Sequence, residues 1–232
     1  MATKKQSAEA ERMAEIVDRL KSVYPESVCA LEWGGQHGGE REALLRESWK
    51  LLVMGRLSAQ CTDARVNIVC RDLFERFPTV EAMADGAIED IEAIVRPCGL
   101  YHTKAQNIKD ACRILVDEHG GIVPDDMDSL LALPGVGRKI ANLLLGDIYK
   151  KGGVVTDTHC IRICGRLGFY EESLKDPLKV ERILTPLIEE SEQSDFCHRI
   201  VQFGRDTCMA RSPACGECPL RDLCKHVQLP SR

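Results

Sequence analysis

The chain has 232 residues, of which 44% are hydrophobic, 29% charged and only 5% aromatic, an ordinary composition for one large or two modest globular domains. Its formal net charge of −5 argues against nucleic-acid binding over the whole surface, because Lys and Arg supply the affinity for phosphate. No apolar stretch approaches the roughly 20 residues that span a bilayer, so the sequence predicts a cytoplasmic protein with no membrane partner.

Apolar residues recur at helical intervals along the chain, and sustained strand alternation is missing. The pattern therefore predicts an all-helical protein with short connections. Between residues 61 and 101 the helical pattern is broken at Pro78, Gly86 and Pro97. Elsewhere helices are predicted at residues 8–24, 42–60, 103–119, 128–133, 137–149, 157–168, 177–190 and 194–206.

Two local patterns predict where these helices are interrupted. Glycines at positions 34, 35, 38 and 39 indicate a loop or linker over residues 31–41. Thr103 and Gln106 match a capping box, which predicts that a helix begins there and stops at Gly120–Gly121.

A glycine-rich turn joins two of the predicted helices at Leu133–Lys139, with the sequence Leu-Pro-Gly-Val-Gly-Arg-Lys. Pro134 and the two glycines permit a tight turn whose backbone a partner can approach closely. The following helix begins near Gly137, and its positive end and first amides suit a phosphate. Glycines are also common in helix connections that bind nothing. However, residues 133–170 carry six basic and two acidic side chains, and this local charge of +4 favours contact with phosphate.

Lys139 lies in the first turn of the helix that follows, beside Arg138. The positive helix end and the guanidinium both disfavour an ammonium ion, which makes Lys139 a candidate amine nucleophile; a phosphate contact is the alternative. Asp157 follows a β-branched run and is a favoured N-cap for the next helix. A carboxylate brought next to the lysine can also stabilise positive charge at a sugar carbon and handle protons. A zinc site is disfavoured at His159, Cys160 and Cys164, because a helical cysteine pair is more often part of a core.

Four of the twelve cysteines form a compact run near the C-terminus, Cys208-x6-Cys215-x2-Cys218-x5-Cys224. Four thiolates at such intervals can converge on one soft metal centre, either an iron–sulfur cluster or zinc. The other eight cysteines are predicted to be reduced, and buried as small hydrophobic side chains.

These motifs together resemble the endonuclease III family of helix-hairpin-helix DNA glycosylases, over roughly residues 45–226. The resemblance rests on Leu57–Asp63, Gly99–Ile108, Leu133–Lys139, Val155–His159, Gly204–Cys208 and the cysteine run. It implies an all-α, two-lobed helix-hairpin-helix fold with a C-terminal [4Fe-4S] cluster loop at residues 208–224. One domain would be a six-helix barrel over 41–151 that includes the hairpin, and the other would combine 1–40 with 152–232.

The resemblance also implies a bifunctional DNA glycosylase and AP lyase of base excision repair, which removes oxidised pyrimidines from duplex DNA. Lys139 would attack the sugar and cut the strand 3′ to the abasic site by β-elimination through a Schiff base, with Asp157 assisting. The implied DNA-binding residues are Gln60 and Leu100, which enter the gap left by the flipped base, and Gly135, Gly137, Arg138 and His159. The implied cluster ligands are Cys208, Cys215, Cys218 and Cys224. Its partner would be duplex DNA with damaged bases or abasic sites, bound by a monomer that is nucleoid-associated in a bacterium.

The chain departs from the family pattern in three places, and one is the glycine-rich insertion near residues 34–39, which lengthens the N-terminal connection. Gly55 and Arg56 interrupt a helix that is usually more continuously apolar, and they are expected not to touch the proposed chemistry. Residues 211–214 carry few basic side chains, which with the acidic net charge predicts modest, salt-sensitive DNA affinity. An adenine-specific mismatch glycosylase and a non-catalytic iron–sulfur DNA-binding module remain alternatives. Lys139 favours the lyase, because mismatch glycosylases usually have serine there.

Overall fold

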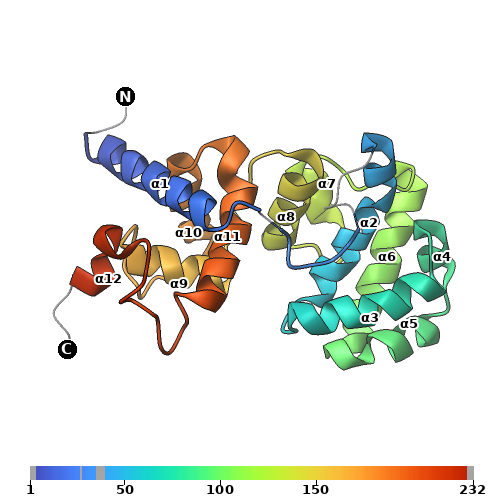
Figure 1. The fold of residues 1–232 in the computed structure, drawn as a ribbon. Coiled ribbons are helices and arrows are strands. Elements are labelled where there is room, and N and C mark those ends of the chain that lie inside the picture. The colour runs from blue at the N-terminus through green and yellow to red at the C-terminus, as the bar shows by residue number, and fades with distance from the viewer. Residues whose placement is uncertain (1–3, 27, 35–39, 229–232) are drawn as a thin grey trace. The chain divides into compact units, whose positions relative to one another are not determined.

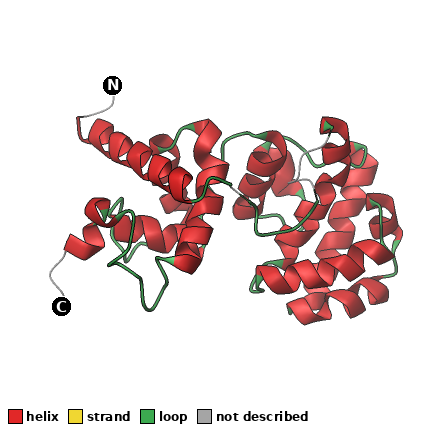
Figure 2. Ribbon diagram, in the orientation of Figure 1, coloured by secondary structure: helices red, strands yellow, loops and turns green. Residues whose placement is uncertain are grey.

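The computed structural model describes residues 4–26, 28–34 and 40–228, which form two compact units. The first unit combines Met1–Val28 with Lys151–Arg232, and the second is Cys29–Lys150. The described residues form helices and loops, without a strand (Figure 2), which confirms the all-helical prediction. Among these residues, no helix has both the length and the apolar character needed to cross a membrane.

The second unit is built around one long helix, α6 (Tyr101–His119), as Figure 1 shows. Helices α2, α4 and α5 pack against α6, while α3 packs against α2 and α5, and α8 packs against α2 and α7. Their apolar faces form one core that includes Leu51, Ile108, Leu115 and Leu144, each fully buried. The remaining bounds are α2 Arg41–Leu57, α3 Asp63–Arg76, α4 Val80–Asp85, α5 Ile88–Val95, α7 Met127–Ala132 and α8 Arg138–Tyr149.

The first unit joins the N-terminal helix to the C-terminal third of the chain. Helix α11 packs against α1 and α9, and the short α12 packs against α9. Met13, Ile163 and Phe196 are fully buried members of a second, separate core. The bounds are α1 Lys4–Val23, α9 Thr158–Leu167, α10 Pro177–Leu184, α11 Gln193–Asp206 and α12 Lys225–Gln228.

Helix ends account for most differences from the sequence predictions. The capping-box prediction is wrong: α6 begins at Tyr101, and its N-cap position is Leu100, which has φ +48°. The helix predicted to reach residue 60 ends at Leu57, where the Ser58 amide donates to Met54 O. The helix predicted over 177–190 ends at Leu184, and a 3₁₀ turn follows, because Pro186 has no amide hydrogen to continue the α-helical ladder.

The segment after α1 joins the second unit earlier than expected. Cys29, Leu31 and Trp33 are buried in the core of Cys29–Lys150, although residues up to 40 were expected in the other domain. Asn67 holds this segment, since its amide group donates to Ala30 O at 3.0 Å and accepts from the Glu32 amide at 3.2 Å. Residues 35–39 of the predicted glycine-rich loop lie outside the described residues.

Candidate active site

The predicted hairpin turn is a β-turn between α7 and α8. The Val136 amide donates to Leu133 O at 3.1 Å, and both side chains are buried, which anchors the turn in the core. Pro134 takes the second position and Gly135, with φ +76°, the third, as a type II turn requires. The turn therefore presents its glycines outward: Gly135 and Gly137 are both exposed.

Lys139 is exposed in the first turn of α8, away from the stripe of Ala141, Leu144 and Ile148 that the helix buries. Gly137 is the N-cap residue and offers no side-chain cap, and a Cβ built on it meets no atom within 4 Å. The backbone at the start of α8 is thus open to a partner, at the end of the helix that attracts anions.

Arg56 lies under this turn and packs against Gly135, although the sequence pattern gave it no role. Its Nε and Nη2 donate to Asn107 Oδ1 at 3.1 and 2.9 Å, and a Cβ at Gly135 would lie 2.6 Å from Arg56 Nε. Gly55 also matters, since a Cβ there would lie 3.2 Å from Cγ2 of Ile140 on α8. Both residues therefore interrupt the apolar pattern of α2 where α8 and the turn before it pack against this helix.

Gln60 and Leu100 are exposed residues on two loops of the same unit. Leu100 is a large apolar side chain that is 62% exposed. Their φ angles are +57° and +48°, and Lys150 is the only other described non-glycine residue with positive φ. Backbone strain of this kind persists only where the surroundings enforce it.

Asp157 and His159 begin α9 in the first unit. The predicted cap is confirmed: the Asp157 carboxylate accepts from the Cys160 amide at 2.7 Å. The His159 ring is held between Arg162, whose Nη2 lies 3.2 Å from Nδ1, and Gly204, where any Cβ would collide with the ring. Asp157 is half-buried. Lys139 belongs to the second unit and Asp157 to the first.

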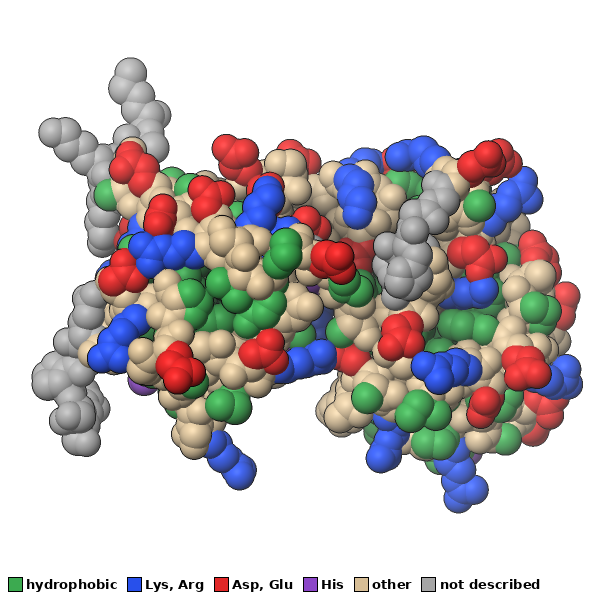
Figure 3. All heavy atoms as spheres, in the orientation of Figure 1, with side chains coloured by type: hydrophobic (Ala, Val, Ile, Leu, Met, Phe, Trp, Pro, Cys, Tyr) green, Lys and Arg blue, Asp and Glu red, His purple; other side chains and the backbone are tan. Residues whose placement is uncertain are grey.

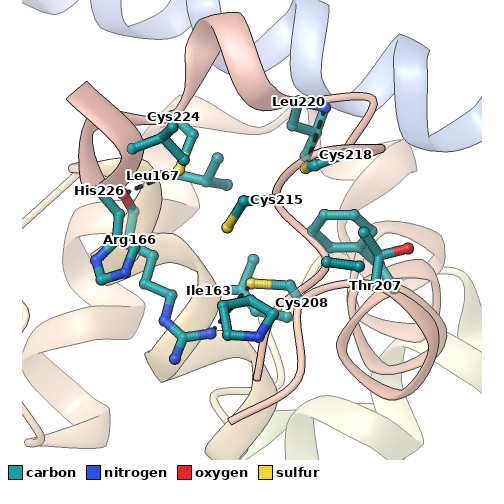
Figure 4. A pocket seen from close by; sticks show the side chains of 14 residues that line it. Ile163, Arg166, Leu167, Thr207, Cys208, Cys215, Cys218, Leu220, Cys224 and His226 are labelled. Atoms are coloured by element: carbon teal, nitrogen blue, oxygen red, sulfur yellow. Dashed lines mark hydrogen bonds between the residues drawn. The ribbon is translucent and has the colours of Figure 1, made fainter. Parts of the chain in front are cut away.

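The four cysteines of the C-terminal run surround a single pocket (Figure 4). All four are free, half-buried thiols in the segment between α11 and α12, and α9 residues also line the pocket. Burial is the main cause that raises the pKa of Cys218 and Cys224, and the charges of neighbouring cysteines raise it further. Four thiolates here therefore need a bound cation to balance them, which is the chemistry of a metal–sulfur centre.

Two arginines of α9 hold the start of this loop. Arg162 Nη2 donates to Cys208 O at 3.0 Å, and Arg166 donates to Met209 O and Ala210 O, both at 2.8 Å. Arg166 Nη1 also lies 3.4 Å from Cys208 Sγ. The sequence pattern did not assign these roles to Arg162 and Arg166, although their i, i+4 spacing on α9 places them on one face.

Charged side chains of both signs are interspersed on the face drawn in Figure 3, as the composition leads one to expect. No broad basic surface appears on that face. Binding to a polyanion there would depend on local features such as the open turn before α8 rather than on overall charge.

Comparison with protein-family models identifies the class. Residues 53–190 match the HhH-GPD superfamily of base excision DNA repair proteins, and residues 208–224 match the iron–sulfur binding domain of endonuclease III. The hairpin and the cysteine pocket thus fall inside the two matched regions. The fold and site define a helix-hairpin-helix DNA glycosylase with an iron–sulfur segment.

The chain belongs to the endonuclease III family. It is 41% identical to endonuclease III of Synechocystis sp. over 229 residues, which cover 98% of this chain and 96% of the relative. It is 35% identical to endonuclease III of Escherichia coli K12 over 214 residues, covering 92% and 95%. It is therefore a bifunctional DNA glycosylase and AP lyase of base excision repair with an iron–sulfur cofactor.

Solved structures agree with this result. A trapped covalent intermediate of endonuclease III with DNA matches with a TM-score of 0.82 at 36% identity, covering 98% of each chain. A non-covalent endonuclease III–DNA complex matches equally well. A thermostable thymine-DNA glycosylase, at 19% identity and a TM-score of 0.80, shares the fold. The two endonuclease III structures are thus both complexes with DNA.

Proposed function

We propose that Lys139 is the nucleophile of this enzyme and that oxidised pyrimidines in duplex DNA are its substrates. The neutral amine attacks C1′ of a nucleotide flipped out of the stack, and the bond to the base breaks. The base leaves with the bonding electrons and takes up a proton. The sugar ring then opens to a Schiff base on Lys139, and loss of a C2′ proton expels the 3′ phosphate.

Lys139 is exposed in the first turn of α8, next to an open glycine turn, and this observation carries the proposal. A nucleophile that attacks a sugar of a DNA strand needs the neighbouring phosphates of that strand to be bound close to it. The turn supplies backbone without side chains at Gly135 and Gly137, and Arg138 adds a positive charge. These three residues would grip the strand on which Lys139 acts.

Asp157 would stabilise the positive charge that develops at the sugar and transfer protons during bond cleavage. Its carboxylate is oriented by the Cys160 amide, and its half-buried position strengthens its electrostatic effect. His159, held beside it by Arg162 and Gly204, would contact the DNA backbone. Gln60 and Leu100 would enter the gap that the flipped nucleotide leaves, the amide meeting base edges and the leucine filling apolar space.

Excision assays on single-lesion duplexes test the substrate class. We expect a duplex with one oxidised pyrimidine to lose that base and to be cut 3′ to the lesion by a monomeric enzyme. An A·G mismatch serves as the comparison, because a mismatch glycosylase would remove its adenine. Removal of adenine without strand cleavage, and no action on the oxidised pyrimidine, would contradict the proposal.

Cys208, Cys215, Cys218 and Cys224 would be the four ligands of a [4Fe-4S] cluster. These residues fit the cluster because four free thiols, which are soft donors, line one pocket. The Arg166 guanidinium lies 3.4 Å from Cys208 Sγ, and the Leu220 amide lies 3.4 Å from Cys218 Sγ. When bound, the cluster would cross-link the loop between residues 208 and 224, a structural contribution that four separated residues cannot make themselves.

Cys218→Ala should remove the brown colour of the purified protein and its iron content. Cys112→Ala is the matched control, because Cys112 is fully buried and burial raises the pKa of its thiol to about 12, so it stays protonated. Iron analysis and visible absorption measure both variants. A colourless wild-type protein that contains zinc would show that the cysteines hold a different metal.

A further inference from the structure

Lys104 is fully buried in α6, and its ammonium group meets three backbone carbonyls. Nζ donates to Leu57 O at 2.9 Å, to Ala59 O at 2.7 Å and to Cys98 O at 2.8 Å. An ammonium ion has three N–H donors, so these carbonyls use all of them. Burial lowers the pKa of Lys104, but only the charged form can make all three bonds.

The three carbonyls belong to the two loops that present Gln60 and Leu100. Leu57 and Ala59 precede Gln60 at the end of α2, and Cys98 lies two residues before Leu100. These are also the loops in which Gln60 and Leu100 adopt positive φ. One buried cation thus joins two chain segments that are about forty residues apart in sequence and strained at their exposed residues.

We propose that Lys104 is a positioning residue that sets Gln60 and Leu100 at a fixed separation for insertion into the DNA duplex. The inference rests on the proposed function of those two residues. A buried lysine is an expensive way to stabilise a core, since an apolar side chain of similar size avoids the cost of removing a charge from water. Its value here is that it fixes two loop backbones at once, which an apolar side chain cannot do.

Loss of the ammonium group would leave three carbonyls without their shared donor and release both loops from their strained conformations. The exposed residues would then sample other positions. The step that displaces the base opposite a lesion would slow most, because it needs Gln60 and Leu100 together. The reaction on a lesion that has no base opposite it would slow least, since no base has to be displaced.

Single-turnover rates on two duplexes test this inference. One carries an oxidised pyrimidine opposite adenine, and the other carries it opposite a tetrahydrofuran abasic analogue, which has no base. Lys104→Met should reduce the first rate by roughly tenfold or more relative to the second, the scale of an unsatisfied buried polar group. The ratio of the two rates does not depend on how much of the variant is folded.

Three comparison variants make the outcome specific. Gln60→Ala and Leu100→Ala should change the ratio in the same direction as Lys104→Met. Ile108→Val, a mild change at a fully buried position one turn along α6, should leave the ratio unchanged. Adding Lys104→Met to the Gln60→Ala, Leu100→Ala double variant should produce little further change, because the three residues act as one unit.

If the ratio changes in the Gln60 and Leu100 variants but not in Lys104→Met, the positioning role of Lys104 is wrong and the gap-filling role of the other two residues stands. Unchanged ratios in Gln60→Ala and Leu100→Ala would overturn the gap-filling role on which it rests. Lys104→Arg carries the same test if the methionine variant does not fold. Its planar guanidinium keeps the charge but cannot converge on three carbonyls, so an intermediate ratio is expected.

Discussion

Lys139→Gln is expected to yield no covalent adduct when the protein is treated with borohydride on a duplex carrying an oxidised pyrimidine. The wild-type adduct requires a Schiff base, which only an amine can form, and glutamine removes the amine while keeping a polar side chain of similar reach. Strand cleavage should fall to background with it. Because Lys139 is exposed, its replacement should change the free energy of unfolding by no more than about 0.5 kcal/mol.

Arg138→Gln is the matched control, since it alters the preceding residue in the same helical turn. It should weaken binding and reduce the slope of log affinity against log salt by about 1, as expected for one lost phosphate contact. At saturating protein it should still give the adduct. If Lys139→Gln trapped DNA as well as the wild-type protein, Lys139 would be a phosphate contact and another amine would be the nucleophile.

The helices were largely predictable because each buries one apolar face, and that periodicity is local. The interior of α8 and α11 follows this rule, and the predicted bounds lie within one residue of the observed ones. Helix ends depend on tertiary contacts instead. The start of α6 at Tyr101 is set by Leu100 in a left-handed conformation, for which the capping-box residues Thr103 and Gln106 gave no signal.

The residues beneath the site were less predictable than those in it. Motifs indicated the turn at Gly135 and the cysteine run, because their spacing is contiguous. Arg56 looked like a break in an apolar helix, yet it packs under Gly135 of the turn and donates to Asn107, 51 positions away. Lys104 stood inside a recognised motif, but its burial and its three carbonyl partners arise only when separate loops meet.

Helix α9 connects the proposed catalytic carboxylate with the cysteine pocket inside the first unit. Its N-terminus carries Asp157, and Arg162 and Arg166 on later turns hold residues 208–210. The loop therefore helps to hold in place the helix that orients Asp157. An ordered loop would keep both arginines engaged, which supports the proposal that the cluster has a structural role.

Asp157→Asn should lower the single-turnover rate of base excision by on the order of 10²–10⁴-fold, the range for loss of a general acid–base group. The fold should be retained, since asparagine caps helices as well as aspartate and can still accept from the Cys160 amide. The substitution therefore removes the charge and keeps the cap. Rate and thermal unfolding, measured on the same sample, separate the two roles.

Asp176 provides the control, because it caps α10 in the same way, accepting from the Lys179 amide at 3.0 Å. Asp157→Ala and Asp176→Ala should each cost about 1 kcal/mol of stability through loss of a cap. Only the change at Asp157 should reduce excision, and Asp157→Asn should match Asp157→Ala in rate but not in stability. Equal turnover of Asp157→Asn and wild-type protein would leave Asp157 as a helix cap and assign the charge stabilisation elsewhere.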